Sequence, residues 1–176
     1  RPHPLVEGRV DPMPVLWLSI LLLAGGSVLG LVLAFLRGWE IFWIGLIGVA
    51  AGVFYTAPPL AYKYKALGEL SVFLMWGPLS VEAAYFVQRQ QLSWDAFWVS
   101  IPFGVLVALV LFANNLRDAE TDESARVSNL AILFGPENGP LVYAAMVLAA
   151  LVSVVVMSVL GPLGPWSLIV LLSLPV

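Results

Sequence analysis

The feature that constrains this chain most is a series of apolar stretches, each about 20 residues long, separated by shorter polar segments. A helix rises about 1.5 Å per residue, so such a stretch crosses the roughly 30 Å hydrocarbon core of a bilayer. Inside that core, a helix gives every backbone N–H and C=O a partner within its own segment. We therefore predict an all-α, polytopic transmembrane helical bundle. The predicted spans are Pro14–Leu36, Trp39–Ala57, Leu67–Val87, Trp94–Ala113 and Gly139–Leu160.

Composition supports an integral membrane protein, because 61% of residues are hydrophobic, 11% are charged and the mean hydropathy is +0.96. A sixth apolar segment begins near Pro165, and the sequence stops at Val176, too early for that segment to span. The first residue is Arg1 rather than Met. We expect a single transmembrane domain over residues 1–176, truncated at both ends.

Residue usage excludes several kinds of chemistry within these residues. The chain has no Cys, which excludes disulfides, thiolate nucleophiles and thiolate metal sites. His3 is the single His, so a multi-histidine metal site is excluded as well. Nothing indicates a nucleic-acid partner.

The cationic residues are distributed unevenly between the two sides of the predicted bundle. Counting alternate connections places six on one side (Arg1, Arg9, Lys63, Lys65, Arg117 and Arg126) and two on the other (Arg37 and Arg89). The positive-inside rule makes the first side cytoplasmic, and we expect a plasma-membrane protein. Three polar segments face that side, at residues 1–13, 58–69 and 114–138. Long segments gathered on one side suggest a functional site there.

The strongest candidate for chemistry is the polar cluster at residues 114–123, directly after the fourth predicted span. On an ideal helix Asn115, Asp118 and Asp122 fall at about 0°, 300° and 340°, so their oxygens share one face, whereas Glu120 points elsewhere. Mg²⁺ prefers one or two carboxylates completed by water and phosphate oxygens. The cluster therefore predicts a diphosphate held through magnesium.

The polar segment after the second predicted span begins with Pro58 and Pro59, which stop the preceding helix. Lys63 and Lys65 follow, with tyrosines on either side. One interpretation is that the lysines contact a phosphate group. The other is that they anchor the chain at the interface and that the tyrosines form an aromatic belt.

Several of these motifs together resemble the UbiA superfamily of intramembrane aromatic prenyltransferases. Asn115-x-x-Asp118-x-x-x-Asp122 resembles the second aspartate-rich motif of that family, and residues 55–59 with Lys63 resemble its tyrosine–lysine loop. The resemblance implies that Asp118 and Asp122 bind Mg²⁺ with Asn115, and that Lys63 is catalytic with them. The expected diphosphate contacts are Tyr55, Lys63, Arg117 and Arg126. Arg117 is the weaker of these, since it projects at about 200° on an ideal helix.

The resemblance extends over essentially the whole sequence. Family members have about nine helices, of which about six would be present here, and the segment at residues 1–9 resembles the one after the first aspartate-rich motif. That first motif would lie upstream. Where the family commonly has Gly-Lys and then Thr-Leu, this chain has Arg126-Val127 and Asn129-Leu130, so Arg126 is the candidate substitute for the lysine.

Residues 68–74, 84–88 and 114–118 look most like the branch that prenylates 1,4-dihydroxy-2-naphthoate for menaquinone. The substrates that this implies are a polyprenyl diphosphate and an aromatic small molecule. Sister enzymes acting on 4-hydroxybenzoate, a chlorophyllide or a glycerol phosphate stay open as alternatives, as does an ion-coupled membrane transporter. Glu82, inside a predicted span, has either a solvated or neutral structural role, or a place in the acceptor pocket or in helix contacts.

Overall fold

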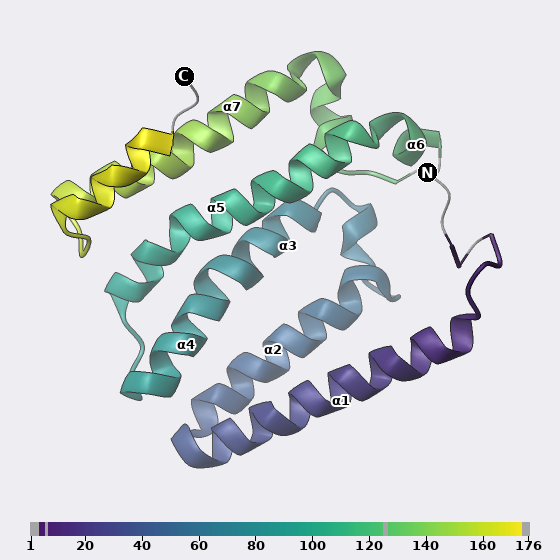
Figure 1. Cartoon of the computed structure of the whole chain (residues 1–176), viewed down its shortest axis with the longest axis horizontal. Helices are drawn as coiled ribbons and strands as arrows, with labels where there is room; N and C mark the ends of the chain where they lie inside the picture. Colours follow the sequence, from purple (N-terminus) through teal and green to yellow (C-terminus); the bar gives the residue numbers. More distant parts are fainter. Residues whose placement is uncertain (1–3, 6, 125–126, 174–176) are drawn as a thin grey trace. The chain divides into compact units, whose positions relative to one another are not determined.

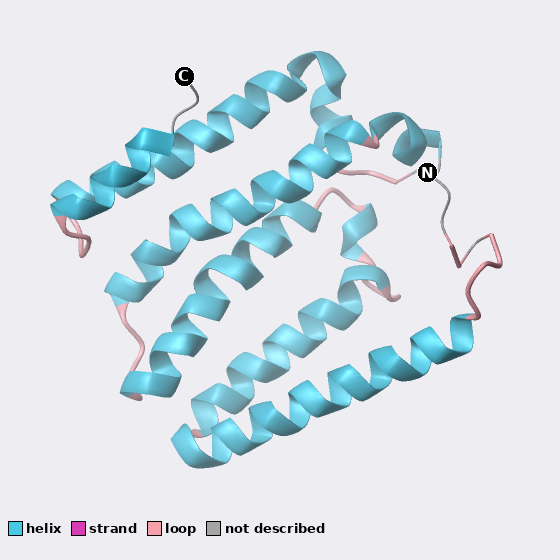
Figure 2. Cartoon of the chain, viewed as in Figure 1, coloured by secondary structure: helices cyan, strands magenta, loops and turns pink. Residues whose placement is uncertain are grey.

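The computed structural model describes residues 4–5, 7–124 and 127–173, and every regular element in these ranges is a helix (Figures 1 and 2). The prediction of an all-α chain is confirmed. Five helices are long and apolar enough to cross a membrane, namely Pro12–Arg37, Trp39–Thr56, Gly68–Arg89, Trp94–Arg117 and Leu130–Val159. The chain forms two compact units, Arg1–Gly45 and Leu46–Val176.

The first unit contains helix α1 (Pro12–Arg37) and the beginning of α2 (Trp39–Thr56). Asp11 caps α1 by accepting a hydrogen bond from the Met13 N–H at 2.9 Å, and Pro12 occupies the first helical position, where no N–H is needed. Gly38 ends α1 with a φ of 126°, a value that favours glycine.

The second unit begins within α2 and contains the remaining elements. They are η1 (Tyr62–Tyr64), α3 (Gly68–Leu74), the π-helical η2 (Met75–Leu79), α4 (Ser80–Arg89), α5 (Trp94–Arg117), α6 (Ala119–Ser124), α7 (Leu130–Val159) and η3 (Pro165–Ser173). Helix α5 lies between α3 and α7 and packs against both (Figure 1). It supplies the fully buried side chains Phe112 and Ser100. This central helix ends at the polar cluster predicted to carry the chemistry.

The predicted spans match the observed helices closely except for the last one. Helix α7 begins at Leu130 rather than Gly139, so the prediction of a polar connection over residues 114–138 is wrong for its final part. Asn129 caps the helix by accepting a hydrogen bond from the Ile132 N–H at 2.9 Å, and the apolar residues after it continue the helix. A break remains at Gly135, whose φ of 76° lies in the region that glycine tolerates.

The segment that begins at Pro165 is a 3₁₀ helix over Pro165–Ser173 and is not among the candidate spans.

The π-helical segment η2, which continues α3, lies close to the backbone of α5. A Cβ added to Gly77 would lie 2.9 Å from the Gly104 Cα, and one added to Gly104 would lie 2.8 Å from the Phe73 carbonyl oxygen. Pro78 lies within η2 and has no N–H to donate, which favours a widened turn. Small residues at such a crossing let two transmembrane backbones pack closely.

We expect Gly104→Ala to lower the free energy of unfolding by about 1–3 kcal/mol, because the new methyl group overlaps the backbone carbonyl oxygen of Phe73, which cannot move independently. Thermal unfolding in detergent measures this change. Gly52→Ala in α2 is the control, since a Cβ there meets nothing within 4 Å. Equal unfolding temperatures for the two variants would contradict the close crossing.

Candidate active site

Two polar segments far apart in the sequence pair through their backbones. Lys65 and Ser128 form a parallel β-bridge. The Ala66 N–H donates to the Ser128 carbonyl at 2.9 Å, and the Ser128 N–H donates to the Tyr64 carbonyl at 3.4 Å. The lysine-bearing loop therefore lies beside the segment that follows the acidic cluster, at one end of the second unit.

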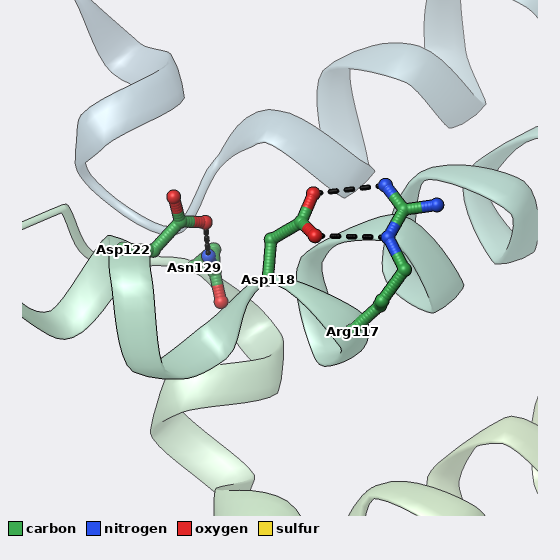
Figure 3. A network of polar contacts seen from close by, with 4 residues as sticks. All are labelled: Arg117, Asp118, Asp122 and Asn129. Carbon is green, nitrogen blue, oxygen red and sulfur yellow. Dashed lines mark hydrogen bonds and ion pairs between the residues drawn. The ribbon is translucent and has the colours of Figure 1, made fainter. Parts of the chain in front are cut away.

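Within the acidic cluster, Asp122 forms hydrogen bonds with the two residues on either side of Ser128. The Val127 N–H donates to the Asp122 carbonyl at 2.9 Å, and Asn129 Nδ2 donates to Asp122 Oδ2 at 3.0 Å (Figure 3). Val127 and Asn129 flank Ser128, which pairs with the lysine loop. Asp122 and the loop that carries Lys63 are thus on the same side of the bundle, as the charge distribution predicts.

The predicted continuous helix through Asn115, Asp118 and Asp122 is wrong. Helix α5 ends at Arg117, Asp118 is its C-cap with φ −99° and ψ 10°, and Asp122 lies in the short helix α6. Acidic side chains four residues apart repel each other in one helix, whereas the first turn of a new helix stabilises negative charge. The break is small, because the Asp122 N–H still donates to the Asp118 carbonyl at 3.0 Å.

This break also changes the position of Arg117. Arg117 Nε and Nη2 each donate to one oxygen of the Asp118 carboxylate at 2.8 Å (Figure 3). The expectation that Arg117 projects away from the acidic face is wrong, since it rested on an ideal helix that ends at this residue. Both side chains remain almost half exposed, at 48% for Arg117 and 44% for Asp118. The guanidinium therefore lies at the cluster and is open to solvent.

Lys63 is held beside aromatic rings. Its Nζ lies 5.9 Å from the ring centroid of Tyr55 and 5.6 Å from that of Tyr64, within the range of cation–π attraction. The Tyr55 and Tyr62 rings meet edge to face with centroids 5.5 Å apart. Tyr62 is itself fixed, because its hydroxyl donates to the Ala51 carbonyl and accepts from Ser71 Oγ. The structure thus brings the predicted pair Tyr55 and Lys63 together.

Glu69 is part of this site, and its role was not apparent in the sequence. Its side chain is only 3% exposed, and Oε1 accepts hydrogen bonds from Asn115 Nδ2 at 2.9 Å and from the Leu130 N–H at 3.2 Å. One carboxylate at the start of α3 therefore contacts the end of α5 and the start of α7. A signal was available, since Glu69 follows the lysine loop directly and opens an apolar span, where an ionisable residue is costly and usually functional.

Two other predicted positions have different outcomes. Arg126 lies outside the described residues. Glu82 Oε2 accepts a hydrogen bond from the Ser93 N–H at 3.2 Å, beside the start of α5. This bond is a helix contact, which is one of the alternatives predicted for Glu82.

The polar side chains at the end of α5 and in α6 are of the chemical types that Mg²⁺ takes as ligands. Within residues 4–5, 7–124 and 127–173 no three His, Cys, Asp or Glu side chains form a group that could enclose a metal ion. The cluster offers two carboxylates, Asp118 and Asp122, and the amide of Asn115. This small set is what Mg²⁺ uses when water and substrate phosphates complete its coordination.

A cavity of about 480 Å³ opens between α2 and the helix formed by α3 and η2. The hydroxyl-bearing residues of its lining are Tyr55, Tyr62, Ser71 and Ser80. The remaining lining is mainly apolar and includes Val72, Met75, Trp76 and Leu79. A neighbouring cavity of about 380 Å³ shares Tyr62 and Ser71 and includes Lys65. Apolar space therefore adjoins the lysine loop.

Comparison with known proteins decides the family. The model of the UbiA prenyltransferase family matches residues 1–176. This chain belongs to the UbiA prenyltransferase family. Membership confirms the resemblance drawn from the motifs and decides against an ion-coupled transporter. No solved structure matches the chain.

Several curated members of the family are similar over most of this chain. The 1,4-dihydroxy-2-naphthoate octaprenyltransferase of Bacillus subtilis is 31% identical over 97% of the chain and 55% of its own length. The protein of the same name from Mycobacterium tuberculosis is 33% identical over 99% of the chain and 59% of its own length. The 2-carboxy-1,4-naphthoquinone phytyltransferase of Synechocystis is 34% identical over 89% of the chain and 51% of its own length. The chain thus spans a little over half the length of such relatives.

The pairing of the two loops can be tested by cross-linking, because the sequence has no Cys. We expect Lys65→Cys combined with Ser128→Cys to form a disulfide on mild oxidation, since bridged residues lie within disulfide reach. Mass spectrometry detects the loss of two hydrogens and the protection from thiol reagents. Lys65→Cys with Ser158→Cys, near the far end of α7, is the control and should stay reduced. Equal oxidation of both pairs would contradict the observed convergence.

Proposed function

We propose that this chain takes part in the Mg²⁺-dependent transfer of a polyprenyl group from a polyprenyl diphosphate to an aromatic acceptor. The acceptor that we propose is 1,4-dihydroxy-2-naphthoate, and the pathway is menaquinone biosynthesis. Family membership supports the reaction class, and two of the relatives described above are named for this acceptor. The observation that carries the proposal is the backbone pairing of Lys65 with Ser128, which unites the acidic cluster with the lysine loop.

The acidic residues would hold the metal. Asp118 and Asp122 supply carboxylate oxygens, and Asn115 supplies its amide oxygen. Bound Mg²⁺ would neutralise the diphosphate and stabilise the negative charge that develops as it leaves. Arg117 holds Asp118 in a bidentate ion pair and can exchange one of these contacts for a diphosphate oxygen.

The lysine loop would bind the diphosphate from the other side. The Lys63 ammonium offers three donors, and Tyr55 offers a hydroxyl near the same ring cluster. As the allylic carbon–oxygen bond breaks, its electron pair leaves with pyrophosphate, and these donors stabilise that charge. A carbon of the electron-rich acceptor ring then forms the new carbon–carbon bond with the allylic carbon. The ring becomes aromatic again when that carbon loses its proton to water or, where it bears a carboxylate, loses CO₂.

The apolar helices would protect the reactive allylic carbon. An allylic cation reacts with water, so the reaction needs a dry environment beside the polar cluster. The cavity between α2 and α3 is mainly apolar and begins at Tyr55 and Tyr62, next to Lys63. We propose that the site lies at the cytoplasmic face of the plasma membrane, where the excess of Lys and Arg is expected.

The full-length protein in detergent should release pyrophosphate from a polyprenyl diphosphate only when Mg²⁺ and an acceptor are present. We expect Asp118→Ala and Asp122→Ala each to lower kcat by about 10²–10³-fold, because each removes a metal ligand that stabilises the transition state. Glu120→Ala is the matched control, since this exposed neighbour lies outside the proposed ligand set. Turnover at the unsubstituted rate in both aspartate variants would refute the proposed metal site.

The acceptor can be identified in the same assay. We expect 1,4-dihydroxy-2-naphthoate to give a higher kcat/KM than 4-hydroxybenzoate, a chlorophyllide or a glycerol phosphate, because two of the relatives described are named for it. The prenylated product is measured by chromatography and mass spectrometry. A higher kcat/KM for one of the other acceptors would keep the reaction class and replace the acceptor.

A further inference from the structure

The buried carboxylate of Glu69 connects three helices at the proposed site. Glu69 lies in the first turn of α3, Asn115 in the last turn of α5, and Leu130 at the start of α7. Glu69 Oε1 accepts from both partners, at 2.9 Å from Asn115 Nδ2 and 3.2 Å from the Leu130 nitrogen. The other oxygen, Oε2, is buried and has no hydrogen-bond partner among the described residues.

Packing alone does not account for a carboxylate at this position. A buried polar atom without a partner costs about 1–3 kcal/mol, and a charged one costs more. An apolar side chain of similar volume would fill the same space without that cost. The contact with Asn115 indicates what the carboxylate provides.

Glu69 Oε1 acts as a hydrogen-bond acceptor for the Leu130 N–H, so the donor end of the Asn115 amide, and not its oxygen, faces the same atom. The Nδ2 group is held by Glu69 Oε1, which leaves Oδ1 as the acceptor end of the amide. Asn115 lies three residues before Asp118, at the end of the same helix. An amide that could rotate freely would present its NH₂ group to a cation in one of its two orientations, and that group cannot act as a ligand.

We propose that Glu69 is a positioning residue for the metal: it orients Asn115 so that Oδ1 is presented with the Asp118 and Asp122 carboxylates. This inference rests on the proposed function, because it assumes that these three residues bind a divalent cation. The bond from the Leu130 N–H fixes Glu69 in turn, and it ties the start of α7 to the same carboxylate. Outer partners of this kind determine ligand orientation at many metal sites.

The test is to measure the affinity of the full-length protein in detergent for Mn²⁺. Electron paramagnetic resonance reports binding as a loss of the signal of free Mn²⁺. We expect Glu69→Gln to weaken Mn²⁺ binding by about 10–100-fold, because a glutamine offers a donor as well as an acceptor and no longer fixes the Asn115 amide. Thermal unfolding without metal is measured on the same samples. A purely structural role would lower the unfolding temperature and leave the Mn²⁺ affinity of the folded protein unchanged.

Glu82→Gln is the matched control. Glu82 is also a carboxylate near one end of a span, and it also accepts from a backbone N–H, that of Ser93, at 3.2 Å. It does not contact Asn115, so its substitution should leave the Mn²⁺ affinity unchanged. Glu69→Met, which removes the carboxylate at similar volume, serves as a second variant if Glu69→Gln does not fold.

A double-mutant cycle shows whether the effect passes through Asn115. We expect Glu69→Gln to cause no further loss of Mn²⁺ affinity in the Asn115→Ala background. If Glu69→Gln lowers the Mn²⁺ affinity as much in the Asn115→Ala background as in the unsubstituted protein, the positioning role is overturned. It is also overturned if Glu69→Gln leaves the Mn²⁺ affinity unchanged while Asp118→Ala abolishes Mn²⁺ binding. Failure of both Glu69 variants to fold, with Asn115→Ala folded and binding normally, would overturn it as well. Absence of Mn²⁺ binding by the unsubstituted protein would instead refute the proposed metal site, and this inference with it.

Discussion

The site depends on one buried interaction, the acceptance of two hydrogen bonds by Glu69 Oε1. A carboxylate removed from water is destabilised unless donors surround it, so the folded chain must bring donors to this point. It does so with the end of α5 and the start of α7. The same contact therefore fixes the register of three helices and the orientation of Asn115, beside the acidic cluster. Stability and the proposed metal site are coupled through this one side chain.

Backbone geometry makes that contact possible. The close crossing at Gly77 and Gly104 sets the distance between the helix that carries Glu69 and the helix that carries Asn115. The Asn129 cap and the break at Gly135 determine where α7 begins, and hence where the Leu130 N–H lies. The Lys65–Ser128 bridge then places the lysine loop against this assembly. Each of these features is local, and together they bring the lysine loop beside the segment that follows the acidic cluster.

Much of this arrangement could be predicted from the sequence. The apolar stretches determine the spans, because a long apolar segment in the hydrocarbon core of a bilayer is stable as a helix, in which its backbone groups bond to one another. The acidic and lysine-bearing segments were both assigned to one side, since the alternation of spans determines which connections share a face. The start of α7 was missed because the Asn129 cap is a local hydrogen bond that outweighs the apparent polarity of the following segment.

The sequence by itself determined the class of protein, the helical spans and the residue types available to the proposed diphosphate site. Only the tertiary structure decided which of these side chains meet. The helix ends at Arg117, so Arg117 turns toward Asp118 instead of away from it. Glu69, which the motifs left unassigned, becomes the partner of Asn115. The physical reason is that helical periodicity orders side chains within one element, whereas burial and hydrogen bonding between elements choose their partners.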